Sequence, residues 1–264
     1  MSIECINFGS ATRIYLLILM LLAIPACPGH AQSAKLLVYT GANGYVHQVT
    51  ESAAQALEEL GRKHHFGVTV SDDSTLFTPD GLEDFDAVLF LNCSGDIVND
   101  AQQEAFRSYL TAGGGFVGIH GATTAENEWD WYGWLVGRYF TAHPKIQTAV
   151  VRVTDPDHPS TWHLPSRWIW TDEWYEFTPA MSDELRVLLT VDESTYDAEF
   201  TSDGTSYKGM QPEHPIAWCQ EWDGGRMFYT ALGHLEGAWS DQNFLEHVYG
   251  GIWWVLGHEG DKSR

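Results

Sequence analysis

Residues 35–120 contain four short apolar runs, each bounded by polar or glycine-rich segments. The runs are too continuous to leave one face in water, as an amphipathic strand would. Continuous runs of this length are typical of strands that are buried on both faces of a parallel sheet. They predict strands at Lys35–Thr40, Phe66–Val70, Asp86–Leu91 and Phe116–His120.

Helical patterns lie between these strands. Apolar positions recur with helical spacing between Val49 and Leu60, and Thr50 is the candidate N-cap. A second helix is predicted to begin at Asn99 or Asp100, before a glycine-rich end at residues 113–115. Because strands and helices alternate with short loops, the pattern predicts right-handed βαβ units and a parallel sheet with helices on both faces.

The second half of the chain is richer in strand patterns and closes with one helix, which runs from a cap at Ser240 to Gly257. Two of the strands flank Asp223-Gly224-Gly225, which is a strong hairpin signal. The predicted strands are Gln147–Val153, Arg167–Trp170, Leu185–Val191, Ile216–Trp222 and Arg226–Ala231. We therefore expect one α/β domain over residues 32–264, with a mostly parallel sheet and β-rich insertions.

The N-terminal segment resembles an export signal. Ile14–Ile24 is an apolar run of 11 residues after Arg13, shorter than the about 20 residues that a membrane-spanning helix needs. Gly29-His30-Ala31 offers a cleavage site. The pattern predicts a signal peptide over residues 1–31, a periplasmic or secreted protein and no transmembrane segment in the mature chain. Lipidation of Cys27 is left open.

Charge and cysteine content narrow the class of ligand. The chain has 36 acidic and 14 basic residues, for a formal net charge of -22, so nucleic acid is excluded as a partner. Neutral ligands, cations and metals fit this charge.

Cys93 and Cys219 remain after the leader, and one disulfide between them is left open. No CxxC motif occurs, which disfavours a thiolate zinc site.

Three polar loops follow predicted strands at the carboxyl edge of the sheet, where open α/β sheets bind ligands. They are Gly41–His47, Asn92–Asp96 and His120–Thr124. Each loop alone could be a turn with helix-capping side chains. Their convergence on one rim favours a ligand site.

The segment Gly118-Ile119-His120-Gly121-Ala122 has the pattern of a strand–elbow–helix turn. Hydrolases place a nucleophilic Ser or Cys at such an elbow, but this chain has a histidine. An imidazole can act as a general base or bind a metal, and it is a poor acylated nucleophile. The sequence therefore predicts that the protein is not a glutaminase.

Six short motifs occur in an order that resembles the ThuA-like (trehalose utilisation) family over about residues 35–257. They are residues 118–121 (GIHG), 140–144 (FTAHP), 157–159 (DHP), 171–175 (TDEWY), 215–218 (PIAW) and 225–234 (GRMFYTALGH). The resemblance implies a flavodoxin-like, class I glutamine amidotransferase-like fold without the amidotransferase cysteine. It also implies a role in disaccharide or keto-sugar catabolism, linked to sugar oxidoreductases. The family often has Arg before the histidine that aligns with His47, whereas this chain has Val46.

Under this fold several polar side chains are expected near the crevice. His120 and Glu173 are the predicted catalytic residues, which would exchange protons, with the pKa of Glu173 raised by nearby aromatic rings. The predicted substrate-binding residues are His47, Asn92, Trp174, Tyr175, His214 and His234. A divalent metal such as zinc is an alternative to pure acid–base chemistry, with His47, His120 and His234 as its ligands.

Some assignments stay open at this point. His143 and His158 each precede a proline, which favours a turn-stabilising role. Trp129, Trp131 and Trp134 form either a sugar platform or part of the core.

The leading hypothesis is an exported enzyme that hydrolyses, eliminates or isomerises an oxidised glycoside. The alternative is a non-catalytic carbohydrate-binding or accessory module. In both cases the partner is a small-molecule carbohydrate, and a homo-oligomer is left open.

Overall fold

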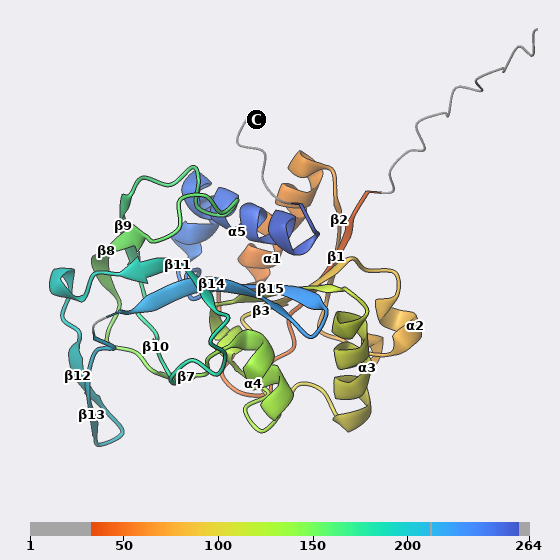
Figure 1. Ribbon diagram of the computed structural model, residues 1–264, viewed down its shortest axis with the longest axis horizontal. Coiled ribbons are helices and arrows are strands. Elements are labelled where there is room, and N and C mark those ends of the chain that lie inside the picture. The colour runs from red at the N-terminus through yellow and green to blue at the C-terminus, as the bar shows by residue number, and fades with distance from the viewer. Residues whose placement is uncertain (1–32, 212, 259–264) are drawn as a thin grey trace, which may run out of the picture. The chain divides into compact units, whose positions relative to one another are not determined.

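The four apolar runs form adjacent parallel strands in a computed structural model of the chain (Figure 1). β1 pairs with β2 and β3, and β3 pairs with β5, in each case in parallel. The prediction of four adjacent parallel strands is therefore confirmed. The strands are β1 (Lys35–Tyr39), β2 (Gly67–Ser71), β3 (Ala87–Leu91) and β5 (Gly115–Ile119).

The structure describes residues 33–211 and 213–258. The predicted signal peptide, residues 1–31, and Cys27 within it lie outside the described residues. Among the helices of the described part, none is long and apolar enough to cross a membrane.

Five more strands extend the sheet to nine, in the order β2-β1-β3-β5-β15-β14-β11-β8-β9. β15 is parallel to β5, whereas the four pairings beyond it are antiparallel. The expected parallel core is therefore present, and the correction concerns the β-rich second half, whose strands continue the same sheet in antiparallel pairings instead of forming insertions. These strands are β8 (Gln147–Val153), β9 (Arg167–Asp172), β11 (Arg186–Val191), β14 (Pro215–Trp222) and β15 (Gly225–Thr230).

The switch from parallel to antiparallel pairing occurs at the β14–β15 hairpin. Its two turn residues, Asp223 and Gly224, have φ angles of 48° and 97°. A tight hairpin turn of this kind needs positive φ at both central positions, for which Asp-Gly is a favoured pair. The hairpin predicted from Asp223-Gly224-Gly225 is therefore confirmed.

Helices cover both faces of the sheet, as predicted. α1 (Thr50–His64) and α5 (Gln242–Val255) lie on one face, and α2 (Pro79–Leu82), α3 (Asp100–Thr111) and α4 (Asp130–Val136) lie on the other (Figure 1). Asn99 caps α3 with a reciprocal capping box. The N-cap of α1 is Val49, so the prediction of Thr50 at this place is wrong by one residue.

Short elements fill the connections. β4 pairs with β6 in parallel, β7 pairs with β10 in antiparallel fashion, and β12 and β13 form an outlying hairpin. Their bounds are β4 (Ser94–Gly95), β6 (Thr124–Ala125), β7 (Phe140–Ala142), β10 (Glu176–Phe177), β12 (Glu199–Ser202) and β13 (Thr205–Lys208). The 3₁₀ turns are η1 (Ser74–Leu76), η2 (His120–Thr123), η3 (Glu193–Thr195) and η4 (Glu236–Ser240).

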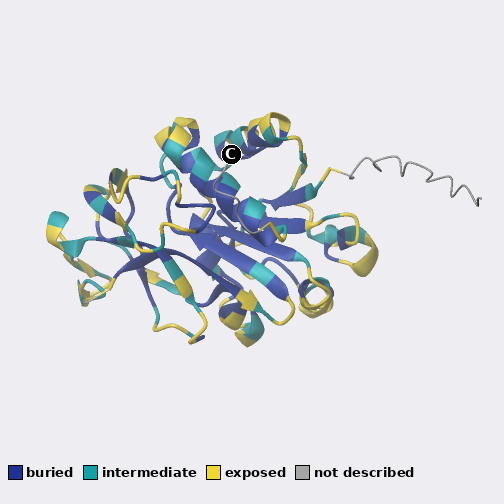
Figure 2. Ribbon diagram, turned by 45° about the horizontal axis from the view of Figure 1, so that its top comes forward, coloured by how far each residue is buried: buried dark blue, intermediate teal, exposed yellow. Residues whose placement is uncertain are grey.

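The central strands form the core, as the dark blue ribbon of Figure 2 shows. Every residue of β3 and β5 is buried, which explains why their sequences are apolar without alternation. Cys93 and Cys219 are both buried and free, so the open question of a disulfide between them is answered in the negative.

His247 makes the stability of the fold sensitive to acid. It is buried in α5, its Nδ1 lies 2.8 Å from the Ser160 carbonyl oxygen, and burial lowers its pKa to about 3. In the unfolded chain the pKa is about 6.5. Between these values the unfolded state binds more protons, so stability is present above pH 6.5 and is lost as the pH falls.

We expect His247→Asn to reduce this loss, because the Asn amide can still donate to the Ser160 carbonyl but does not titrate. Between pH 6.5 and 4.5 the parent should lose about 2 kcal/mol more free energy of unfolding than this variant. Urea unfolding at the two pH values measures the difference. The control is His65→Asn at an exposed histidine, and an equal pH dependence in all three proteins would refute the prediction.

Candidate functional site

Four chain segments bring polar side chains together at the carboxyl edge of the parallel strands. His120 directly follows β5, and His234 lies in the loop after β15. His47 precedes α1 in the loop that leaves β1, and Glu173 directly follows β9. The His120 ring centroid is 4.8 Å from that of His47 and 5.1 Å from that of His234. The predicted convergence at this edge is therefore present in the fold.

His120 is fixed at the elbow by its backbone and by one ring nitrogen. Its φ is 48°, a left-handed conformation that costs energy for a residue other than glycine. Its Nδ1 lies 2.7 Å from the Ala231 carbonyl oxygen. Because a carbonyl only accepts, Nδ1 carries the proton, and in the neutral ring Nε2 presents a lone pair. That lone pair is 2.7 Å from the Tyr175 hydroxyl and 3.1 Å from Nδ1 of His234.

His47 and His234 are held in the neutral form. Burial, together with the nearby rings of His120 and His234, lowers the pKa of His47 to about 3. Burial and the proximity of His120 also lower the pKa of His234. The Nδ1 atom of His47 is buried and has no hydrogen-bond partner among the described residues. Together with His120 these two residues form the histidine cluster, defined as His47, His120 and His234, whose ring centroids lie within 5.5 Å of one another.

Glu173 borders the histidine cluster. Its carboxylate oxygens lie 3.2 Å from His234 Nδ1, 3.5 Å from His120 Nε2 and 3.7 Å from His143 Nε2. Burial alone would raise the pKa of Glu173, but the hydrogen bond of His120 and the positive charge that His120, His143 and His234 carry when protonated outweigh burial and lower it. The expectation of a pKa raised by aromatic neighbours is therefore wrong, and Glu173 is ionised at neutral pH.

Asp172 supports the cluster without touching it, a role that the sequence did not reveal. Its buried carboxylate accepts hydrogen bonds from the Trp170 indole (3.0 Å) and from the backbone amides of Glu173 (3.0 Å), Gly233 (2.9 Å) and His234 (3.3 Å). One carboxylate thus joins the end of β9 to the loop after β15. Asp172 thereby fixes the positions of Glu173 and His234 relative to each other.

His143 also lies nearer to the site than predicted. Its Nδ1 is 2.8 Å from the carbonyl oxygen of Pro144, which fits the expected turn-stabilising role. Its Nε2, however, faces Glu173. His158 remains a turn residue, since its Nδ1 contacts the hydroxyl and amide of Ser160.

Two predicted substrate-binding residues cannot reach a ligand. Trp174 is fully buried and donates its indole N–H to the Gln147 carbonyl. His214 is buried behind Tyr175, with Nε2 on the Tyr175 carbonyl and Nδ1 on the Glu193 carboxylate, each at 2.8 Å. Neither side chain has a polar atom left for a substrate.

Tyr175 lies beside the histidine cluster, and Asn92 lies in the loop after β3; their predicted role in substrate binding stays a prediction. The Tyr175 hydroxyl contacts His120. Asn92 has a φ of 55° and donates to the Thr50 hydroxyl at 3.3 Å, while its Oδ1 is buried without a partner among the described residues. A buried carbonyl oxygen without a donor is unusual, and it lies in the loop directly after β3.

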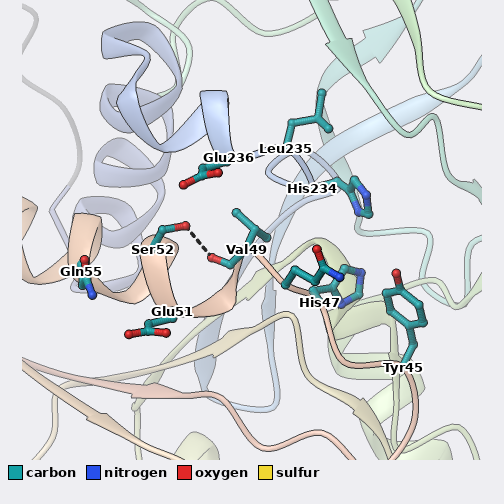
Figure 3. A pocket seen from close by; sticks show the side chains of 10 residues that line it. Tyr45, His47, Val49, Glu51, Ser52, Gln55, His234, Leu235 and Glu236 are labelled. Atoms are coloured by element: carbon teal, nitrogen blue, oxygen red, sulfur yellow. Dashed lines mark hydrogen bonds between the residues drawn. The ribbon is translucent and has the colours of Figure 1, made fainter.

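A groove of about 500 Å³ opens from the histidine cluster along the start of α1 (Figure 3). His47, His234 and Tyr45 line one side of it, and the carboxylates of Glu51 and Glu236 line the other (Figure 3). This volume is in the usual range for small-molecule sites. The described lining contains no Lys or Arg, so the groove suits an uncharged or cationic ligand.

The tryptophans of residues 129–134 do not line this groove. Trp129 and Trp131 pack against the core with ring centroids 4.9 Å apart, and Trp134 stacks on Trp222. Of the two interpretations left open, packing is therefore favoured over a sugar platform at this site.

The residues of the cluster fit a divalent metal. One nitrogen from each of His47, His120 and His234 can be chosen so that all three lie within 4.8 Å of one another. Tetrahedral zinc with Zn–N bonds of about 2.1 Å separates its ligand nitrogens by about 3.4 Å, so the widest separation would have to shorten. Three imidazoles, one with an unpartnered buried nitrogen, are a suitable donor set for this ion.

The chain resembles known proteins over most of its length. A family model described as ThuA, trehalose utilisation, matches residues 35–255. A solved ThuA-like protein from Bacteroides uniformis is 24% identical with a TM-score of 0.73, over 89% of this chain and 96% of that one. A second, from Parabacteroides merdae, is 20% identical with a TM-score of 0.67, over 87% and 92%.

A more distant likeness involves a β-galactosidase from Rahnella sp. R3. It is 14% identical with a TM-score of 0.53, over 84% of this chain but only 31% of the β-galactosidase. At these identities the solved structures share the fold with this chain and say nothing of its chemistry. No curated protein matches the chain.

Proposed function

The chain belongs to the ThuA family, and from this premise we propose that it is an exported, metal-assisted enzyme of disaccharide or keto-sugar catabolism. The family description, trehalose utilisation, gives the protein a carbohydrate-related role. We propose that the reaction is hydrolysis, elimination or isomerisation of an oxidised glycoside. The observation that carries the proposal is the convergence of His47, His120 and His234 beside the ionised Glu173.

The lowered pKa values of His47 and His234 favour metal binding over pure acid–base catalysis. A histidine must be unprotonated to bind a metal, and His47, with a pKa of about 3, meets this condition throughout the neutral range. A neutral ring with so low a pKa is also a weak proton donor and acceptor near pH 7. When bound, a divalent metal would polarise a carbonyl or lower the pKa of a water.

The side chains around the cluster supply the other parts of the reaction. Glu173 is the proton acceptor. Because its pKa is lowered, it is a weak base and suits a substrate proton that is already acidic, such as that on a carbon beside a keto group. His120 is held in one tautomer by Ala231, so its Nε2 faces the reacting centre. The groove over α1 holds the rest of the substrate, and its carboxylates Glu51 and Glu236 accept hydrogen bonds from sugar hydroxyls.

The parallel half of the sheet supports a flavodoxin-like, amidotransferase-like assignment as part of this proposal. Numbered along the chain, its strands β2-β1-β3-β5-β15 have the order 2-1-3-4-5, which is that of flavodoxin-like sheets. A sugar oxidoreductase that introduces the keto group is the functional partner that this proposal requires. Export follows from the predicted signal peptide.

A non-catalytic carbohydrate-binding module is the alternative. Binding modules hold sugars on exposed aromatic rings, and Tyr45 is the one aromatic residue of the described groove lining. A sugar-binding surface also has no need for a buried carboxylate among histidines. These two observations favour an enzyme.

Metal analysis of the gently purified protein, combined with a screen of native and 3-keto disaccharides, tests the proposal. We expect a retained divalent metal and turnover of a keto-disaccharide that chelation abolishes. Alanine at His47, His120 or His234 should weaken metal affinity by about 10-fold or more, because each is a large share of the ligand set. Stoichiometric metal that survives all three substitutions would place the site elsewhere, and metal-independent turnover would favour acid–base chemistry.

A further inference from the structure

The Tyr175 hydroxyl occupies the one nitrogen of His120 that could bind a metal. Nδ1 of His120 is committed to the Ala231 carbonyl at 2.7 Å, and the Tyr175 hydroxyl lies 2.7 Å from Nε2. Since a carbonyl cannot donate, Nδ1 is the protonated nitrogen and the hydroxyl donates to the lone pair of Nε2. A metal and this hydroxyl therefore compete for the same lone pair.

The surroundings of Tyr175 leave its hydroxyl few other acceptors. The side chain is buried, with ring centroids 4.3 Å from Phe140 and 6.2 Å from Phe177. The nearby Glu173 carboxylate already lies within 3.7 Å of three histidine nitrogens. A buried hydroxyl without an acceptor is costly, so once released from His120 it needs an oxygen that enters the site from outside.

We propose that Tyr175 is a hydrogen-bond donor that is stored on His120 and released to the substrate when Nε2 of His120 binds the metal. The inference rests on the metal site of the proposed function and adds a role for a residue outside the ligand set. In the metal-free protein the hydroxyl is satisfied by His120. In the loaded protein it donates to a substrate oxygen, so metal loading and substrate binding strengthen each other.

The test compares two tyrosine-to-phenylalanine variants by chelator competition with zinc at pH 7. Tyr175→Phe removes the competing hydroxyl and keeps the ring among its apolar neighbours, so zinc should bind about 2–10-fold more tightly, the worth of one net hydrogen bond. Tyr229→Phe is the matched control. The Tyr229 hydroxyl also contacts His120, at 2.8 Å, but on its backbone carbonyl, so zinc affinity should not change.

A second measurement separates this role from a general loss of structure. With zinc saturating, Tyr175→Phe should lower turnover of the 3-keto disaccharide that the parent accepts by about 10²-fold, as expected for a lost donor to developing charge. Tighter zinc with slower turnover supports the proposal, because a damaged site would lose both. Equal or weaker zinc binding in Tyr175→Phe, with zinc still bound by the parent through His120, overturns this inference alone. A parent that binds no zinc overturns it together with the metal site.

Discussion

His120→Ala is expected to lower sugar turnover by about 10²–10⁴-fold, the usual worth of a positioned catalytic group. The buried ring is held by Ala231 and contacts Tyr175 and His234 through Nε2. Steady-state kinetics on the keto-disaccharide that the parent accepts gives the value. His120→Asn, which can hydrogen-bond but offers no imidazole nitrogen, should be almost as poor.

The control for His120 is Cys93→Ser, which should leave turnover within a few-fold of the parent. Cys93 is buried, its Sγ lies 3.2 Å from the Tyr39 carbonyl oxygen, and burial raises the pKa of the thiol. Glutamine hydrolysis on an elbow needs a thiolate there, so no glutaminase activity is expected. Near-normal turnover in His120→Asn would mean that the elbow only binds substrate. Loss of turnover in Cys93→Ser with His120→Ala unharmed would mean that the wrong residue has been assigned.

Asp172→Ala is expected to have the largest effect on stability. The substitution leaves four donors, three of them backbone amides, without their acceptor at the junction of β9 and the loop after β15. Losing a buried charged partner of this kind costs about 3–5 kcal/mol of unfolding free energy. Because His234 and Glu173 are then free to move, zinc affinity should fall as well. Urea unfolding and chelator competition measure the two effects.

The comparison for Asp172 is Asp197→Ala, an acidic residue that is exposed and should change stability by no more than about 0.5 kcal/mol. Asp172→Asn should lie between the two, because the amide oxygen still accepts while the amide N–H₂ faces donors. A loss below about 1 kcal/mol in Asp172→Ala would show that water replaces the carboxylate, and the proposed positioning role would be wrong.

Local patterns account for what could be predicted from the sequence. The strands around β3 and β5 were identifiable because burial on both faces demands continuous apolar runs. The elbow histidine was identifiable because small residues must flank a sharp turn, and His120 has a φ of 48° there. Since these signals are confined to a few adjacent residues, the four parallel strands β1, β2, β3 and β5 and the position of His120 could be predicted from the sequence.

The errors have a different origin, since they concern contacts between distant segments. Trp174 and Tyr175 are adjacent in the sequence, but only Tyr175 contacts the histidine cluster. The indole of Trp174 donates a hydrogen bond to the carbonyl oxygen of Gln147 on β8. The hydrogen bonds of Asp172 to backbone amides leave no trace in the sequence, because any residue can supply an amide. Likewise, strand patterns alone do not state that β8 and β9 continue the main sheet.

The same limit applies to the electrostatics of Glu173. Its aromatic neighbours in sequence predicted a raised pKa, whereas His120, His143 and His234, which come from other segments, lower it. This difference changes the chemistry, because an ionised carboxylate beside three histidines fits a metal-assisted site better than a protonated acid does.

The measurement that tests the central claim most directly is an anomalous difference map at the zinc absorption edge, from crystals of the protein loaded with zinc. We predict one strong peak bound by nitrogens of His47, His120 and His234, with Glu173 beside it and the Tyr175 hydroxyl turned away from His120. A peak at another position, or none at zinc concentrations that saturate the protein in solution, would contradict the proposed metal site.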